Sequence, residues 1–346
     1  MTENFRKLAK ISLVLVYLVI IAGAVVRMTG SGMGCPDWPK CFGYYVPPTD
    51  AETLRWKQKK EFRKGQVIIL NETLRVAQKN FVTKEVFNEK NWEVYTKHNY
   101  ATFNVWHTWI EYINRLFGAL AGLATLFLAI FSLKFWQRNK KITLFSWLVV
   151  IGMGFQAWLG ATVVYSVLEP VKITIHMVMA LVIVAIILYL IFKSDKQNKL
   201  HKSHKTISTI IAGSLFITLI QIILGTQVRQ FVDEQIDVVG ENAKELWLLK
   251  PTLQFYIHRS LSILVVLING YLFFKIKKYS LGFEKINWVI YLIVFEVLTG
   301  ILMYYIEFPF GSQPLHLVLA SLLFGVQFYL VLETLKASKS HKTLYL

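Results

Sequence analysis

The sequence has few charged residues for its length. Charged side chains make up 17% of its 346 residues, whereas hydrophobic side chains make up 55%, and the mean hydropathy is +0.46. One soluble domain of this size has no core large enough to bury that much apolar surface. The composition therefore excludes a single soluble domain and predicts that lipid covers part of the chain.

Cysteine is almost absent: Cys35 and Cys41 are the two in the chain. Both lie in the segment that follows the first apolar run. Their closeness allows a disulfide, a redox-active pair or two free thiols. A bridge is favoured, because an outer compartment is oxidising and the chain holds two cysteines.

Eight apolar runs are long enough to cross roughly 30 Å of hydrocarbon. They are Ile11–Val26, Trp106–Phe135, Leu144–Val167, Ile173–Phe192, Ile207–Val228, Leu253–Phe274, Trp288–Ile306 and Leu315–Leu335. The first run lacks an Ala-x-Ala-like cleavage site, so we expect a helix there and not a signal peptide. The sequence predicts an all-α integral membrane protein with eight transmembrane helices.

Acidic residues are scarce, 21 against 38 lysines and arginines, which gives a formal charge of +17. Such an excess can indicate nucleic-acid binding, but here the basic residues gather in alternate loops. They are Arg6, Lys7 and Lys10 before the first span, Lys134, Arg138, Lys140 and Lys141 after the second, Lys193, Lys196, Lys199, Lys202 and Lys205 after the fourth, Lys275, Lys277, Lys278 and Lys285 after the sixth, and Lys336, Lys339 and Lys342 after the eighth. The positive-inside rule then predicts that both termini are cytoplasmic, and no nucleic-acid partner is expected.

The other loops lie on the outer side in this topology. The loop after the fifth span carries the acidic residues Asp233, Glu234, Asp237, Glu241 and Glu245. The loop over residues 28–103 is long and mixed in charge, and long loops translocate with little regard to charge. We expect this loop to be the one sizeable soluble part.

The chain contains an internal repeat of four spans. Phe155–Ala180 aligns without a gap on Phe295–Ala320, at an offset of 316 − 176 = 140. Two further matches pair Tyr112–Arg115 with Tyr256–Arg259, and Gly23–Arg27 with Gly225–Arg229. Because four spans is an even number, the repeat is parallel and equivalent residues lie at equal depth. We expect two tandem four-helix bundles, over residues 1–200 and 201–346.

Ionisable side chains inside spans are costly and are therefore candidates for function. His176, His258 and His316 open the fourth, sixth and eighth spans, all close to the outer face. Two histidines at equal depth on facing helices, as expected for His258 and His316, can hold a heme iron from both sides. Zinc usually requires more ligands, and for each histidine taken alone a hydrogen-bonded residue at a helix mouth is the competing interpretation.

Arginines and one glutamate accompany these histidines. Arg115 and Arg259 directly follow Asn114 and His258, and Arg27 and Arg229 end their helices at the same face. Such arginines can pair with heme propionates, or they can anchor the spans at the interface. Glu111 has an apolar equivalent in the second repeat, because 255 − 111 = 144 leads to Phe255. A carboxylate beside a heme can serve as a general base or stabilise a cation; a simple ion pair with Arg115, one turn on, is the alternative.

These residues resemble those of the heme A synthases over nearly the whole chain. The resemblance rests on Gly30–Cys41, Ile110–Arg115, Gln156–Gly160 with His176, Leu224–Arg229, and His258–Arg259 with His316. It implies an oxidoreductase that converts the C8 methyl group of heme O to the formyl group of heme A by successive hydroxylations, with oxygen from water. It also implies a heme b cofactor on His258 and His316, substrate heme in the first half, and catalysis by Glu111.

The chain departs from the family pattern at Asn114, where a histidine is usual. His107 lies one turn before Glu111, so it can take the place of the missing ligand if the helix extends that far; a surface histidine is the alternative. A substrate heme held by His176 alone also suits chemistry at the porphyrin edge. The loop after Cys41 is longer than is usual in the family.

The resemblance also predicts a setting. We expect an inner-membrane protein with its heme sites near the outer face, a role in cytochrome oxidase assembly, and a heme O synthase and an electron acceptor as membrane partners; a homo-oligomer stays open. The main alternative is a diheme b-type cytochrome that takes electrons from quinol without modifying heme. A transporter is less consistent with the sequence, because the spans lack Gly/Pro-broken helices at mid-depth.

Overall fold

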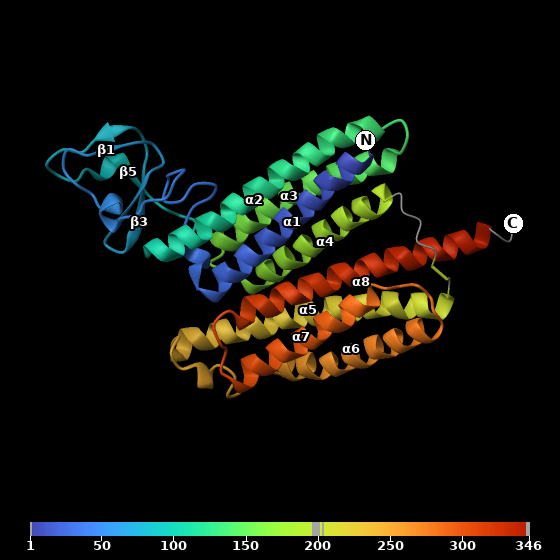
Figure 1. The fold of residues 1–346 in the computed structure, drawn as a ribbon. Coiled ribbons are helices and arrows are strands. Elements are labelled where there is room, and N and C mark those ends of the chain that lie inside the picture. Colours follow the sequence, from blue (N-terminus) through green and yellow to red (C-terminus); the bar gives the residue numbers. More distant parts are fainter. Residues whose placement is uncertain (1, 196–200, 203, 344–346) are drawn as a thin grey trace. The chain divides into compact units, whose positions relative to one another are not determined.

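Eight long α-helices lie among the residues that the computed structural model describes, 2–195, 201–202 and 204–343. They appear in chain order from blue to red in Figure 1. Their bounds are α1 Thr2–Met28, α2 Val105–Ser132, α3 Lys140–Tyr165, α4 Pro170–Ser194, α5 Lys205–Val239, α6 Leu253–Lys278, α7 Ile286–Tyr305 and α8 Ser312–Thr343. Each is long and apolar enough to cross a membrane, which confirms the predicted all-α membrane fold. Lys196, Lys199 and the repeat boundary at residue 200 lie outside the described residues.

Helix α5 is longer than the apolar run that predicts it. The run ends at Val228, whereas the helix continues to Val239 and carries Asp233 on its last turns. Side-chain pairs one turn apart stabilise this polar extension: Arg229 pairs with Asp233, and Gln230 donates to Glu234. Asp233, Glu234 and Asp237 were expected in a loop, and that expectation is wrong.

The chain divides into two compact units. One comprises Met1–Tyr17, Gly122–Met153 and Met177–Leu346, and the other comprises Leu18–Ala121 and Gly154–His176. The division falls within α1 to α4 and leaves α5 to α8 whole. We call the first the bundle unit and the second the loop unit. These units differ from the predicted repeat halves, residues 1–200 and 201–346, and those halves stay a prediction.

In the bundle unit, α5 to α8 form a closed four-helix bundle. Helix α5 packs on α6 and α8, and α7 packs on the same two helices. Its apolar interior contains a buried polar cluster, formed by Ser214, Asn269 and Gln327 from α5, α6 and α8. Ser214 Oγ donates to Asn269 Oδ1 at 3.1 Å, and Gln327 Nε2 reaches Ser214 Oγ at 3.2 Å. Hydrogen bonds of this kind join helices in lipid, where water cannot replace them.

The long loop of the loop unit folds into short strands, which the sequence analysis did not predict. The strands are β1 Glu61–Phe62, β2 Val67–Leu70, β3 Thr73–Ala77, β4 Phe81–Val82 and β5 Trp92–Val94. They form an antiparallel β2-β3-β5 sheet and a β1-β4 pair. Phe62, Ile68 and Trp92 bury a small core of their own. The other face of the β2–β3 hairpin, through Val67 and Leu74, packs on Cys35 and Cys41.

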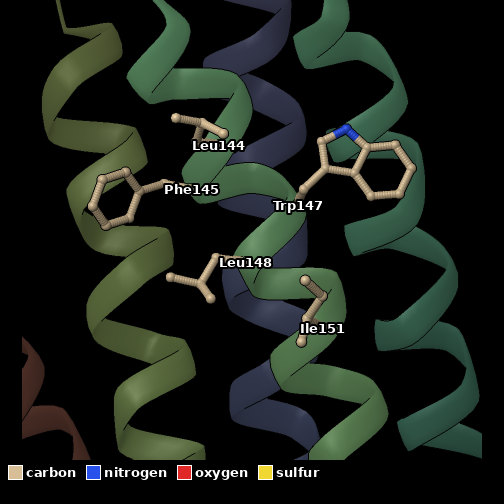
Figure 2. A pocket seen from close by; sticks show the side chains of 5 residues that line it. All are labelled: Leu144, Phe145, Trp147, Leu148 and Ile151. Atoms are coloured by element: carbon tan, nitrogen blue, oxygen red, sulfur yellow. The ribbon is translucent and has the colours of Figure 1, made fainter.

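One surface pocket of the bundle unit is apolar throughout. It is lined by five residues of α3, shown in Figure 2: Leu144, Phe145, Trp147, Leu148 and Ile151. No acid, base or nucleophile lines it, so we assign it to contact with lipid chains.

Candidate functional site

His258 on α6 and His316 on α8 face each other within the bundle unit. Their ring centres lie 6.3 Å apart, with the ring planes at 71°. Two imidazoles that bind one metal from opposite sides have ring centres about 6 Å apart, from metal–nitrogen bonds of about 2 Å and about 1 Å from each nitrogen to its ring centre. The separation of the two rings is therefore compatible with two imidazoles that bind one metal ion. Within the described part of the chain, no group of three or more His, Cys, Asp or Glu is arranged to hold a metal ion.

His316 is fixed by two groups on α7. Its Nδ1 lies 2.9 Å from Glu296 Oε2 and 2.8 Å from Thr299 Oγ1. The Thr299 hydroxyl also donates to the carbonyls of Phe295 and Glu296. When Glu296 is ionised and the imidazole is neutral, the carboxylate only accepts and the ring proton lies on Nδ1. The lone pair of Nε2 is then left to bind a metal, the tautomer that ligand histidines need.

His258 is held through its backbone and by a close glycine. Gln221 Nε2 donates to the His258 carbonyl at 2.7 Å. A Cβ built on Gly225 of α5 would lie 3.2 Å from His258 Cε1, so no larger residue fits there without a shift. The ring nitrogen Nδ1 is buried and makes no hydrogen bond to the described residues. This histidine is positioned by packing, unlike His316.

His176 in the loop unit has matching neighbours. Gln156 Nε2 on α3 donates to the His176 carbonyl at 3.0 Å, and a Cβ on Gly160 would lie 3.5 Å from His176 Cε1. On the facing side, a Cβ on Gly23 would lie 3.9 Å from Asn114 Oδ1. Asn114 thus lies against a glycine, as His258 does in the other half. The Asn114 Oδ1 is buried and has no hydrogen-bond partner among the described residues.

Glu111 lies buried near the start of α2, with 4% of its surface exposed. Its Oε2 accepts from the Cys35 amide at 2.7 Å, and its Oε1 accepts from Arg115 at 2.5 Å. Arg115 also donates to the carbonyls of Cys35, Asp37 and Lys40. The predicted ion pair is present, and both residues hold the loop that contains the cysteines.

Cys35 and Cys41 form a disulfide, as expected. Within the loop they close, the Asp37 carboxylate accepts from the amides of Phe42 and Gly43. Burial raises the pKa of Asp37, against the opposing effects of the Gly43 amide and Arg115. Tyr95 and His98 of the long loop both bond the Pro36 carbonyl at 2.9 Å. Residues 35–43, which we call the cysteine loop, are thereby fastened to α2 on one side and to the strand-bearing segment on the other.

The remaining candidates lie near helix ends. Arg27 is half-buried in the last turn of α1, and Arg229 pairs with Asp233 on α5. Arg259 is exposed and stacks over the Tyr304 ring, 5.7 Å from its centre. His107 lies half-buried in the first turn of α2, where its backbone carbonyl abuts Gly34. The helix does extend that far, as the ligand hypothesis for His107 requires.

The sequence analysis missed the groups that act on the histidines from neighbouring helices. Glu296 was aligned with Gln156 without being assigned a role, and Thr299 and Gln221 were not singled out. Glu296 could have been singled out from the sequence, because an acidic residue inside an apolar span is costly and is therefore a candidate for function. No pattern along the sequence, however, shows that Glu296 of α7 meets His316 of α8.

Fold and site together define a polytopic membrane protein with histidines set early in its helices. The chain belongs to the COX15-CtaA family of cytochrome oxidase assembly proteins, whose model matches residues 6–328. It is 24% identical to the heme A synthase of Flavobacterium johnsoniae over 348 residues, 91% of this chain and 93% of the relative. It is 28% identical to the heme A synthase of Shewanella oneidensis over 220 residues, but there spans about half of the relative's length, 54%. A third relative, the heme A synthase of Flavobacterium psychrophilum, is 24% identical over 347 residues.

Proposed function

We propose that this chain is a heme A synthase, a membrane oxidoreductase that converts the C8 methyl group of heme O to the formyl group of heme A. The family match over residues 6–328 supports the class. The single observation that carries the enzyme assignment is Glu111, a carboxylate buried where the repeat has Phe255. A pure electron conduit would not need a base beside one heme. The comparisons give the diheme cytochrome alternative no support, since the relatives reported above are named heme A synthases.

In the second half, His258 and His316 hold heme b. The fit rests on the ring separation of 6.3 Å and on the proton at His316 Nδ1, which leaves Nε2 to bind iron. When bound, this group supplies a one-electron relay. The chain fixes the ring of each ligand, through Glu296 and Thr299 for His316 and through Gly225 for His258. Arg259 and Arg229 offer guanidinium groups for the propionates.

In the first half, His176 binds the substrate heme O, and Glu111 is the catalytic base. Oxidising a methyl group with oxygen from water releases protons and electrons in equal number, so a base and an electron exit are both required. Glu111 can take the proton from water or from the methyl carbon, while Arg115 keeps the carboxylate in place. We assign Asn114 and Arg27 to this site as polar contacts of the substrate heme.

His107 is proposed as the second substrate ligand, because Asn114 has replaced the usual histidine. His107→Ala is expected to lower the amount of heme O bound, while heme b stays on the second-half pair. Heme content of the purified variant, separated by chromatography, measures both at once. An unchanged heme O content would leave His176 as the sole ligand in the first half.

The proposed setting is the inner membrane, with both termini cytoplasmic and the heme sites near the outer face. The substrate would come from a heme O synthase in the same membrane, and the electrons would pass to a membrane acceptor.

The test is to express the chain with a source of heme O and to separate the extracted hemes by chromatography. Hydroxylated heme O and heme A are expected with the wild type. His258→Ala and His316→Ala should each lose the spectrum of bound heme b. Absence of any oxidised product from wild-type protein that has bound heme would refute the enzyme assignment.

A further inference from the structure

The histidines of α4 and α8 share a glycine behind the ring but differ in their polar neighbours. Gly160 and Gly300 back His176 and His316 at comparable distances, 3.5 and 3.8 Å from ring Cε1 to an added Cβ. Besides Gly300, the face of α7 that meets His316 carries Glu296 and Thr299. The positions 140 residues earlier on α3 hold Gln156 and Leu159.

On α7, both polar groups act on the imidazole. The carboxylate of Glu296 and the hydroxyl of Thr299 lie within 2.9 Å of His316 Nδ1. A carboxylate that accepts from this nitrogen pulls its proton away from the ring, which makes Nε2 a more basic and stronger ligand. The side chain of Glu296 is 14% exposed, so water screens this interaction little.

On α3, neither residue acts on the ring in that way. Gln156 uses its amide to donate to the His176 backbone carbonyl, and Leu159 is an apolar side chain. Both Gln156 Oε1 and His176 Nδ1 are buried without hydrogen bonds to the described residues. Among the described residues, the His176 ring therefore has no hydrogen-bonded anionic partner.

We propose that Glu296 is a positioning residue that makes the second-half site retain its heme at a low potential, and that Gln156 leaves the first-half site able to release its heme. The proposal rests on the proposed function, in which one heme is a resident cofactor and the other is substrate and then product. A substrate site must exchange its ligand at each turnover, whereas a relay must keep it. The residue on the neighbouring helix sets this difference, while the histidine is common to both.

The test for Glu296 uses Glu296→Gln, which keeps the shape and introduces the residue that α3 already has. In the full-length purified protein, heme transfer to excess apomyoglobin should become about 10- to 100-fold faster, as is usual when the partner of a ligand histidine is removed. The midpoint potential of the remaining heme b should rise, because a negative charge beside the iron favours the oxidised state. The heme should keep its two-histidine spectrum.

Glu307→Gln is the matched control, because it removes the same charge from an exposed residue after α7 and should change neither quantity. A transfer rate and a potential that both stay at the wild-type values in Glu296→Gln overturn the proposal. A change in rate with an unaltered potential overturns it as well, because a structural role alone would produce that result.

The reciprocal test introduces into the first half the two hydrogen-bond acceptors that contact the histidine in the second half. In a His316→Ala background, where the second pair is broken, Gln156→Glu with Leu159→Thr should slow the release of heme O at least about 10-fold. Release at the parental rate overturns the role assigned to Gln156. Heme A production by the wild type decides the proposed function separately: a chain that makes no heme A but loses heme b faster as Glu296→Gln would refute the function and keep this inference.

Discussion

Glu111 is held on both carboxylate oxygens, one by the Cys35 amide and one by Arg115. A base with two fixed partners is well oriented, and orientation is a large part of what an enzyme supplies. The same contacts make the carboxylate sensitive to the cysteine loop. A substitution that preserves the shape of the side chain is therefore needed to separate its proposed catalytic role from its structural one.

Glu111→Gln is such a substitution. The amide oxygen can still accept from Cys35, so the cysteine loop should stay docked, whereas a base is no longer present. We expect product formation to fall about 100-fold or more, in the range found for general bases, with heme b retained. Chromatography of extracted hemes measures the product, and the exposed Glu93 on β5 provides a neutral control as Glu93→Gln. Full activity of Glu111→Gln would show that the residue has a structural role alone.

At the residue scale, the sequence marks candidate ligands but not the groups on neighbouring helices that contact them. The histidines could be found because a repeat and a costly ionisable group mark them. Glu111 and Arg115 could be paired because they lie one turn apart on one helix. Glu296 could not be assigned, since its partner lies on another helix and the contact depends on packing.

At the scale of elements, glycines let α5 and α7 approach the histidine rings of α6 and α8. Gly225 and Gly300 have no side chain at the place where the imidazole lies. The ring orientation is thus set by a helix surface, which is more rigid than a loop. The same arrangement recurs at Gly160 and His176.

Gly225→Ala tests this role. The added Cβ would lie 3.2 Å from His258 Cε1, so the ring must move by a few tenths of an ångström, and we expect a lower heme b content and a shifted absorption spectrum. Gly213→Ala on the same helix meets nothing within 4 Å and should leave the heme unchanged while stabilising the helix by roughly 0.5–1 kcal/mol. Equal heme spectra for the two variants would contradict the role of Gly225.

The cysteine loop is an element in its own right, since it joins α2 to the strand-bearing segment. Replacing both cysteines by serine should destabilise the loop by about 2 kcal/mol, the chain-entropy value for so short a closure. Tryptic cleavage within residues 28–103 should become faster, and product yield should fall, because Glu111 loses a fixed partner. Dithiothreitol should reproduce the effect on wild type and add nothing to the serine variant. Wild-type cleavage rates in the variant would mean that the hydrogen bonds of the loop hold it without the disulfide.

At the scale of the whole molecule, the alternation of basic loops predicts which side each loop faces. Val86 in the long loop and Lys141 in the first turn of α3 are both exposed, so each can be replaced by cysteine, and Cys35 and Cys41 are bridged. A membrane-impermeant maleimide added from the outer side should label Val86→Cys and spare Lys141→Cys. The opposite labelling pattern would invert the proposed topology.

The number of helices could be predicted because a span needs about 20 apolar residues and little else resembles it. The polar end of α5 could not, because pairs such as Arg229 with Asp233 extend a helix without any apolar signal. The short strands also escaped prediction. Strands of two to five residues bury too few alternating positions to stand out, and they are held by packing in their own small core and against the cysteines.

The polar cluster of Ser214, Asn269 and Gln327 has a consequence for how the bundle is made. As the ribosome releases the helices in order, Asn269 enters the membrane with α6 after Ser214 is already there, and its own amide bonds the Val265 carbonyl of the same helix. The side-chain amide of Asn269 thus has a hydrogen-bond partner within its own helix. Gln327 arrives last, on α8, and closes the cluster, so the order of translation is also the order in which the bundle's hydrogen bonds can be completed.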